Sequence, residues 1–341
     1  MLLIRPSAVG DVIMVLPSLE ALRHSFPQAY IGFIVEDRAQ DLIVGHPSVD
    51  RVHLFPRKSW KRAARQPKRW ANVWREVGKF AEEIRKERYD ISVDFQGNLK
   101  GSLLGLIGGA RRRLGYSSVY SRELNHLFTN VHVTPAPGDI HRAEKFQSLV
   151  RFLGAQTAYA DYRLPDSADS RRRVQEFLRA HELSKYAVIH PGTSDFGRAK
   201  RWSPDRFSAV ARNLGGLGLS VVVAWGPGEQ ALAEQIAADS AGNAIVSLET
   251  QSILDLAELL REATIFVGCD SGPMHLCSAV NTPAVVIFGP HNPEIYGPFK
   301  HPHVRLVHKR RNGVGRTDWV TAEDVNEAVV ELLQKVSAPR L

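Results

Sequence analysis

Short apolar runs alternate with helical patterns along the first half of the chain. Apolar runs typical of buried strands lie at residues 2–6, 30–36, 50–56 and 90–97. A helical pattern follows the first of them, over residues 15–27, and Pro27 closes it. Strands that alternate with helices predict a parallel sheet covered on both faces.

The same alternation restarts in the second half. Strands are expected at 185–192, 219–226, 244–249, 264–272 and 283–290, with helices at 203–218, 229–240, 252–263 and 273–280. The pattern predicts a second doubly wound parallel sheet. The fold class is therefore α/β, with two Rossmann-like domains that face each other across a cleft.

A stretch rich in Asp, Ser and Pro separates the two patterns near residue 166, so we expect domains at 1–165 and 166–341. A last helix is expected at 321–336, where Thr321 is followed three residues later by Asp324, close to a capping box. This helix could pack on either domain.

Composition adds a charge argument. The chain has 341 residues, a net charge of +8 and a pI of about 9.6. An excess of cations attracts anionic partners, namely nucleic acid, a membrane surface or phosphorylated substrates, without choosing among them.

Two cysteines, Cys269 and Cys277, cannot form a disulfide framework or a four-ligand zinc site.

The N-terminal apolar stretch contains Arg5 and Asp11 and lacks a basic leader and a cleavage site, and no apolar run is long enough to span a bilayer. We therefore expect a cytoplasmic protein whose membrane contact, if any, is peripheral.

Two loops after predicted strands suit phosphate. In "HPGTSDFGRAKRWSP", Gly192 permits unusual backbone conformations, Thr193 and Ser194 offer hydroxyls and amides, and Lys200 adds positive charge. The alternative is an ordinary surface loop with solvated cations.

The second loop is "DSGPMHL". Asp270, Ser271 and Gly272 form a tight turn before a helix whose first turn accepts Pro273, and the backbone amides there favour an anion. His275 lies close to this turn, although a single histidine on a helix is often a core residue.

Gly226, Gly228 and Ala231 form a G-x-G-x-x-A pattern after a strand and before a helix, and Glu249 follows about 20 residues on. This dinucleotide fingerprint suggests an NAD-dependent oxidoreductase. The pattern belongs to the second strand of its half, however, and Pro227 interrupts it. Glu229 could instead accept hydrogen bonds from a ribose.

A basic segment lies in the first half. Residues 51–75 hold nine Lys or Arg, no Asp or Glu, and three of the six tryptophans. From Trp70 to Ile84 the apolar residues have helical spacing. This helix either lies on an anionic membrane or packs on the core with a solvated basic face.

Asp11 is the single acid in the small and apolar stretch "SAVGDVIMVLP". It could simply cap the helix that follows. A carboxylate in a cleft of low dielectric can also have its pKa raised toward neutrality and act as a general base.

Taken together, "GDV", "HPGTSDFGRAKRWSP" and "DSGPMHL" followed by "NTPAVVIFGP" resemble glycosyltransferase family 9, the lipopolysaccharide heptosyltransferases of GT-B fold. The resemblance covers nearly the whole chain. "FIVED", "HPSVDRV" and "WGPGE" look more like the branch that adds the first heptose to the Kdo of lipid A.

The resemblance implies that Asp11 is the catalytic base of an inverting transfer from ADP-heptose, with no cofactor and no metal. The nucleotide sugar would bind the C-terminal domain. The residues expected to contact it are Thr193, Ser194, Lys200, Glu229, Ser247, Leu248, Asp270, Ser271, Gly272 and His275.

The acceptor implied is an anionic glycolipid, Kdo-lipid A, bound by the N-terminal domain at the cytoplasmic face of the inner membrane. Arginine suits its carboxylates and phosphates through bidentate pairing. The residues expected to contact it are Arg57, Lys58, Lys61, Arg62 and Arg122.

Three alternatives remain open at this point. A family-9 transferase could add a later heptose or another sugar. An oxidoreductase would explain the glycine pattern, and a nucleic-acid-binding protein would explain the charge. Neither of the last two accounts for Asp11 and both loops together, so we expect no nucleic-acid partner.

Overall fold

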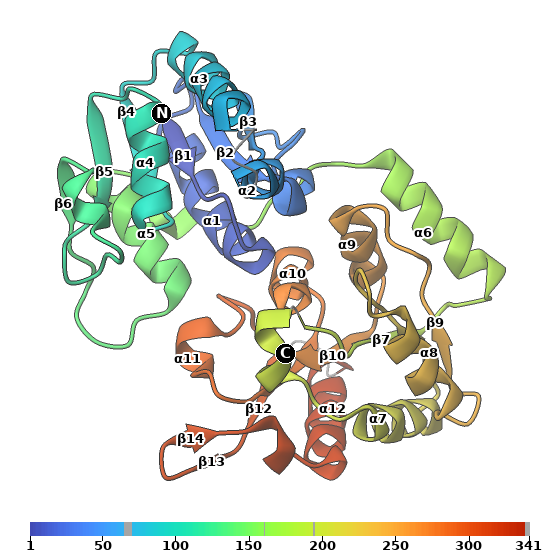
Figure 1. Ribbon diagram of the computed structural model, residues 1–341. Coiled ribbons are helices and arrows are strands. Elements are labelled where there is room, and N and C mark those ends of the chain that lie inside the picture. The colour runs from blue at the N-terminus through green and yellow to red at the C-terminus, as the bar shows by residue number, and fades with distance from the viewer. Residues whose placement is uncertain (65–69, 160, 194, 338–341) are drawn as a thin grey trace. The chain divides into compact units, whose positions relative to one another are not determined.

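The computed structural model describes residues 1–64, 70–159, 161–193 and 195–337. The chain divides into two compact units, Met1–Asp166 and Ser167–Leu341. Each unit contains one six-stranded parallel sheet with helices around it (Figure 1).

The sheet of the first unit has the strand order β3-β2-β1-β4-β5-β6, which is the Rossmann order. Its strands are β1 (Leu2–Ile4), β2 (Gly32–Glu36), β3 (Arg51–Phe55), β4 (Ile91–Asp94), β5 (Arg112–Tyr116) and β6 (Val131–Val133). The order reverses between β1 and β4, so the loops after these two strands meet at the carboxyl edge of the sheet.

Helices cover both faces of this sheet. They are α1 (Val9–Ser25), α2 (Arg57–Ala64), α3 (Trp70–Lys86), α4 (Leu99–Ile107) and α5 (Arg142–Phe152). Leu2 and Ile4 join a core cluster with Ile84 of α3 and Leu104 of α4, while α1 packs against α5. Leu3, which points to the opposite face, is also fully buried.

The second unit repeats this order as β12-β11-β10-β7-β8-β9. Its strands are β7 (Tyr186–His190), β8 (Ser220–Val223), β9 (Ala244–Val246), β10 (Ile265–Cys269), β11 (Ala284–Phe288) and β12 (Val304–His308), with a small hairpin of β13 (Arg310–Arg311) and β14 (Val314–Gly315). Here the order reverses between β7 and β10.

Seven helices of the described chain belong to the second unit. They are α6 (Ala168–Ala180), α7 (Pro204–Gly216), α8 (Gln230–Ala238), α9 (Ile253–Arg261), α10 (Gly272–Val280), α11 (Pro293–Tyr296) and α12 (Ala322–Ser337). Helix α12 packs on α7, β11 and β12, all within this unit. Its first turn has the expected capping box, in which Thr321 and Asp324 exchange hydrogen bonds of 2.7 and 3.3 Å.

The prediction of two doubly wound parallel sheets is confirmed, although some elements differ. Helix α1 begins at Val9, earlier than expected, because the continuous apolar run from Val12 to Leu16 is buried on every side and shows no amphipathic period. Strands β5, β6 and β12, the β13–β14 hairpin and helices α4, α5, α6 and α11 were not predicted. Strands β5 and β6 have five and three residues, and β5 opens with two arginines.

The packing of α12 leads to the first prediction. Leu332 is fully buried in the core of the second unit. We expect Leu332→Ala to lower the free energy of unfolding by about 2–5 kcal/mol, because the lost methyl groups leave a cavity. Urea denaturation would measure this, with Glu327→Ala on the exposed side of the same helix as the control. Equal stability of the two variants would contradict the assignment of α12 to this core.

Candidate active site

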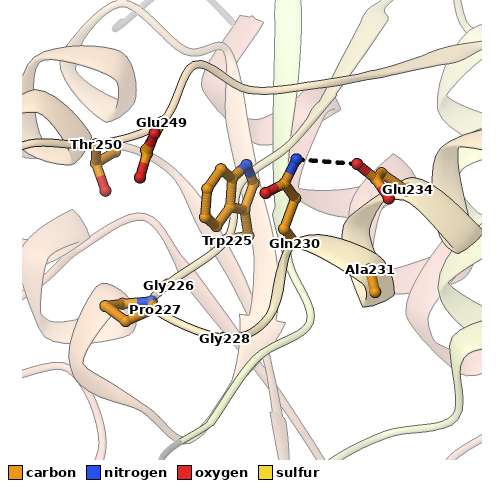
Figure 2. Close-up of a pocket in the computed structure, with 9 residues that line it drawn as sticks. All are labelled: Trp225, Gly226, Pro227, Gly228, Gln230, Ala231, Glu234, Glu249 and Thr250. Atoms are coloured by element: carbon orange, nitrogen blue, oxygen red, sulfur yellow. Dashed lines mark hydrogen bonds between the residues drawn. The ribbon is translucent and has the colours of Figure 1, made fainter.

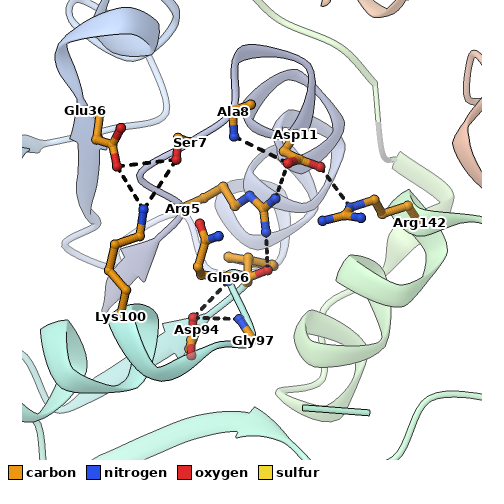
Figure 3. A network of polar contacts seen from close by, with 11 residues as sticks. Arg5, Ser7, Ala8, Asp11, Glu36, Asp94, Gln96, Gly97, Lys100 and Arg142 are labelled. Carbon is orange, nitrogen blue, oxygen red and sulfur yellow. Dashed lines mark hydrogen bonds and ion pairs between the residues drawn. The ribbon is translucent and has the colours of Figure 1, made fainter. Parts of the chain in front are cut away.

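The loop after β1 carries Asp11 into the first turn of α1. A buried arginine, Arg5, directly follows the strand and is only 1% exposed. Its Nη1 donates to the carbonyl of Phe95 at 2.7 Å, just after β4, and its Nη2 pairs with Asp11 Oδ2 (Figure 3). Arg5 therefore links the two strands where the sheet order reverses and fixes the carboxylate of Asp11 above them.

Asp11 has a second cationic partner. Arg142, the first residue of α5, places Nε 2.8 Å from Asp11 Oδ1. The backbone N–H of Ala8 also donates to Asp11 Oδ2 at 3.3 Å, so the carboxylate does cap α1 as well. Helix capping accounts for one of three contacts and leaves the two ion pairs unexplained.

The electrostatics of Asp11 differ from the expectation. Burial alone raises its pKa, but the guanidinium of Arg5 and then that of Arg142 outweigh burial and hold the pKa below its usual value. The structure therefore contradicts the possibility of a shift toward neutrality. Sequence reasoning considered burial alone and missed both arginines.

A second polar cluster lies at the same edge. Glu36 at the end of β2 accepts from Lys100 Nζ at 2.8 Å, and Ser7 Oγ lies 3.3 Å from the same carboxylate oxygen (Figure 3). Arg57 Nη1 lies 3.5 Å from the other oxygen. The loop after β1, the end of β2, and the starts of α2 and α4 thus meet around one carboxylate.

Asp94, the last residue of β4, is the most buried acid of this edge. It accepts hydrogen bonds from the backbone N–H groups of Gln96 and Gly97 and from Asn125 Nδ2 at 2.5 Å. Burial raises its pKa to about 6 despite these donors. Its partners are backbone and amide groups of the adjoining loops, so it serves to shape the turn between β4 and α4.

The expected acceptor contacts are placed as follows. Arg57 reaches Glu36, Arg62 is exposed on α2, and the backbone of Arg122 donates to Gly97 O at 2.9 Å, next to the β4–α4 turn. Arg57 and Arg122 therefore lie at the edge that holds Asp11. The side chains of Lys58 and Lys61 lie outside the described part of the structure.

The basic helical segment has two different parts. Trp60 on α2 packs edge-on against Phe55 and Phe80 in the core. On α3, by contrast, Trp70 is 55% exposed and Trp74 is 73% exposed. The C-terminal part of α3 packs on the sheet, whereas its N-terminal part presents two large aromatic rings to solvent.

In the second unit, the loop after β7 is tied to the turn after β8. Arg201 donates to Thr193 Oγ1 at 3.1 Å and lies 3.5 Å from Glu229 Oε1. Glu229 also accepts the N–H of Gly226 at 3.1 Å, and its carboxyl covers Gly192 so closely that a side chain there would clash. Thr193 and Glu229 are thus brought together, while Ser194 lies outside the described residues.

The loop after β10 holds a charged group of three residues. Asp270, 6% exposed, accepts from His291 Nδ1 at 2.7 Å, and Lys200 Nζ lies 3.0 Å from the same oxygen. Burial raises the pKa of Asp270, but the hydrogen bond from His291 and the charge of Lys200 prevail and lower it. Lys200 and Asp270, predicted separately, are therefore ion-paired.

Helix α10 begins beside this group as expected. Ser271 is its N-cap residue, Gly272 and Pro273 form its first turn, and His275 is buried within it. The backbone amides of this turn lie at the carboxyl edge of the second sheet, next to Asp270.

A cavity of about 700 Å³ lies beyond β8 and β9 (Figure 2). Its size is that of a small-molecule site. Nine residues line it, namely Trp225, Gly226, Pro227, Gly228, Gln230, Ala231, Glu234, Glu249 and Thr250. Ser247 borders it, because its carbonyl accepts the indole N–H of Trp225 at 3.3 Å and its hydroxyl donates to Leu248 O at 3.0 Å. The residues of the glycine pattern therefore form part of the wall of this pocket.

Sequence reasoning missed five residues at these two edges, namely Arg5, Lys100, Arg142, Trp225 and His291. Arg5 carried a signal, since it directly follows a buried strand. Trp225 stands next to the glycine pattern that was recognised. The other three come from separate segments, and their partners are visible only after folding.

Two further features concern the membrane and metals. Among the described residues, none of the helices is long and apolar enough to cross a membrane. No group of three or more His, Cys, Asp and Glu in the same residues could hold a metal ion.

Two Rossmann-like domains, each with polar and charged groups at the carboxyl edge of a parallel sheet, are the architecture of a GT-B glycosyltransferase. The family model of glycosyltransferase family 9 (heptosyltransferase) matches residues 77–317, more than half of the chain. The protein belongs to this family.

Curated relatives agree over most of the length. The lipopolysaccharide heptosyltransferase 1 of Pseudomonas aeruginosa is 28% identical over 309 residues, covering 89% of this chain and 82% of the relative. The lipopolysaccharide heptosyltransferase 3 of Escherichia coli K12 is 24% identical, covering 82% and 79%.

A solved structure gives the same fold. The structure described as E. coli heptosyltransferase WaaC with ADP-2-deoxy-2-fluoro heptose matches with a TM-score of 0.76 and 25% identity, covering 97% of this chain and 98% of the other. The protein is thus a glycosyltransferase, and the oxidoreductase and nucleic-acid-binding alternatives lose their support.

The charged group at Asp270 predicts a pH dependence of stability. A carboxyl whose folded pKa lies below its unfolded value, near 3.8, stabilises the fold above that value and loses this effect as the pH falls through the folded pKa. We expect Asp270→Asn to lower the free energy of unfolding by about 1–3 kcal/mol at pH 7, because Lys200 and His291 lose their partner. This difference should shrink as the pH falls through about 4 and below.

Urea denaturation at a series of pH values would measure the effect. Asp169→Asn is the matched control, because Asp169 is 75% exposed and pairs with Arg172 on the same helix. A pH-independent difference between wild type and Asp270→Asn would show that the carboxylate charge is not the cause.

Proposed function

We propose that the protein transfers L-glycero-D-manno-heptose from ADP-heptose to the Kdo of lipid A, a step of lipopolysaccharide inner-core synthesis. The single observation that supports this proposal is the position of Asp11. This residue is an acid held at the carboxyl edge of the first sheet by two arginines, in a chain of the heptosyltransferase family.

In the proposed reaction, Asp11 is the general base. One carboxylate oxygen takes the proton of an acceptor hydroxyl as the hydroxyl oxygen attacks the anomeric carbon of the donor. The bond from that carbon to the diphosphate breaks, and ADP leaves with the electron pair. A single displacement inverts the anomeric centre, so it needs no covalent enzyme intermediate, cofactor or metal.

The lowered pKa of Asp11 suits this role in one respect. The carboxylate is ionised at neutral pH, so it can accept a proton. A carboxylate of low pKa accepts the proton effectively only as the attacking oxygen becomes acidic in the transition state. Release from one of its two arginines would make it a stronger base.

For the donor, we propose the edge of the second sheet. The adenine would occupy the pocket beside Trp225, near Ser247 and Leu248, and Glu229 would hold the ribose. The diphosphate would meet the amides after Ser271. The matching E. coli structure with ADP-2-deoxy-2-fluoro heptose supports this type of donor.

Charge explains the remaining donor contacts. The departing diphosphate gains negative charge that fixed donors and cations must offset. Lys200, with Thr193, Ser194 and His275, would supply this. Because Lys200 pairs with Asp270, donor binding would exchange that carboxylate for a phosphate, and His291 would keep Asp270 paired.

For the acceptor, we propose the first domain. The acid groups of a Kdo-lipid would meet Arg57, Lys58, Lys61, Arg62 and Arg122. Arg57 and Arg122 support this assignment by their positions near Asp11.

Removal of the base provides the central test. We expect Asp11→Asn to lower the transfer rate from ADP-heptose to Kdo-lipid A by about 10²–10⁴-fold. Binding of ADP-heptose, measured by calorimetry, should be unchanged, because the donor groups lie in the other domain. Asp169→Asn is the control. A variant that keeps more than about a tenth of the rate would exclude Asp11 as the base.

The exposed N-terminal part of α3 suggests how the enzyme reaches a lipid acceptor. We propose that Trp70 and Trp74 enter the headgroup region of the cytoplasmic leaflet of the inner membrane, with Arg75 and Lys79 near the anionic phosphates. Both indoles are more than half exposed. An apolar ring beside cations matches an anionic bilayer surface.

Binding to vesicles would test the membrane contact. Arg75→Gln should weaken binding to vesicles of phosphatidylglycerol and phosphatidylcholine about fivefold, since each cation near such a surface contributes about 1 kcal/mol. Arg179→Gln, an exposed cation on α6, should leave binding unchanged. Equal effects of both variants would mean that net charge, and not this surface, drives binding.

The similarity to a heptosyltransferase 3 supports a second candidate, a transferase that adds a later heptose or another sugar. The same transfer assay separates the two. A wild-type protein that binds ADP-heptose but does not modify Kdo-lipid A would favour the later step, and heptosylated core acceptors should then be tried.

A further inference from the structure

The edge of the first sheet carries an excess of positive charge beside Asp11. Four cationic side chains belong to it: Arg142, Arg122 and Arg5 all lie close enough to Lys145 to affect its charge, and Arg142 also lies close to Arg5. Arg5 and Arg142 share the one carboxylate of Asp11. Within the described residues, neither Lys145 nor Arg122 forms an ion pair with a carboxylate.

Among these four cations, Lys145 has the least expected position. It is half-buried on the first turn of α5, where the helix dipole disfavours a cation. Its Nζ lies 4.4 Å from the ring centre of Tyr116 and 5.6 Å from that of Tyr120, and it donates to Tyr120 O at 2.9 Å. A carbonyl and two aromatic faces hold the ammonium group without neutralising it.

The surroundings are unfavourable for the charge of Lys145. Burial, and then the charges of Arg142, Arg122 and Arg5, lower its pKa to about 8. An anion bound here would relieve this repulsion and would satisfy the remaining donors of the ammonium group. Lys145, Arg122 and Arg142 therefore form a cationic cluster, which adjoins Asp11 through Arg142.

We infer that Lys145, with Arg122 and Arg142, binds an acidic group of the acceptor, a sugar carboxylate or a phosphate, next to Asp11. The inference rests on the proposed function for the identity of the acceptor, but not for the presence of the anion subsite. The buried ring of Tyr116 lies against the ammonium group of Lys145, and the partly exposed ring of Tyr120 lies beside it.

Occupation of this subsite would also act on the base. An acceptor acid that takes over Arg142 removes one of the two ion pairs that stabilise the Asp11 carboxylate. Asp11 would then be a stronger base only when an acidic acceptor is bound. The subsite would thus select an anionic acceptor twice, through binding and through activation of the base.

The first experiment uses variants of the full-length enzyme and Kdo-lipid A. Lys145→Gln should raise the acceptor KM by about ten- to a hundredfold, as for a lost charged hydrogen bond, and leave the donor KM unchanged. Lys145→Arg keeps the charge and should restore most of the affinity. Lys185→Gln, at an exposed lysine of the other domain, is the control. An unchanged acceptor KM in Lys145→Gln would overturn the inference.

The second experiment does not depend on transfer. The rate of acetylation of Lys145 by an N-hydroxysuccinimide ester is followed by mass spectrometry in the wild-type protein, alone and with free Kdo or inorganic phosphate. Protection of Lys145, but not of Lys185, by Kdo alone supports a carboxylate site. Equal protection by phosphate supports a phosphate site.

The two experiments separate the possible failures. Protection of Lys145 in a protein that does not modify Kdo-lipid A would retain the anion subsite and reject the proposed acceptor. If neither anion protects Lys145, the subsite is rejected, whatever the enzyme transfers.

Discussion

The guanidinium of Arg5 joins three parts of the first domain at one buried point. It donates to the carbonyl after β4, pairs with Asp11 on α1, and lies over the ring of Phe146 on α5 at 5.2 Å. A buried charge of this kind is tolerated only with a partner. Asp11 therefore serves the fold as the partner of Arg5, in addition to its role in the proposed chemistry.

The two domains share one topology but handle charge in opposite ways. In the second domain, Asp270 has Lys200 and His291 as partners, and Glu229 has Arg201. In the proposed mechanism, a diphosphate that binds there would exchange one anion for another. In the first domain, Arg5 and Arg142 share Asp11, and Lys145 lies near Arg122 and Arg142, so an acidic group that binds there would add a missing charge. The arrangement in the second domain suits a ligand that must leave after reaction. The arrangement in the first domain suits recognition of an acidic acceptor.

The glycine pattern after β8 shows why a motif alone misleads. A strand, a tight turn and a helix produce a pocket for a nucleoside whichever cofactor or substrate carries it. Residues of the fingerprint line the cavity beside Trp225, and family membership shows that the protein with this cavity is a transferase. The place of the strand within its sheet, second and not first, already argued against a dinucleotide.

Local pattern was enough to predict the alternation of strands and helices, the two sheets, the capping of α12 and the candidate acid Asp11, because each depends on neighbours in the chain. Strands β5, β6 and β12 were not predicted, since they are short, β5 begins with arginines, and β12 is only partly buried. Only the tertiary structure decided that Arg142 and Arg5 meet at Asp11, that Lys100 pairs with Glu36, and that Lys145 has no carboxylate partner among the described residues. These contacts join residues distant in sequence, and a pKa follows the charges around a group in space. For that reason the sequence could name the acid, but only the fold could show that its pKa is lowered.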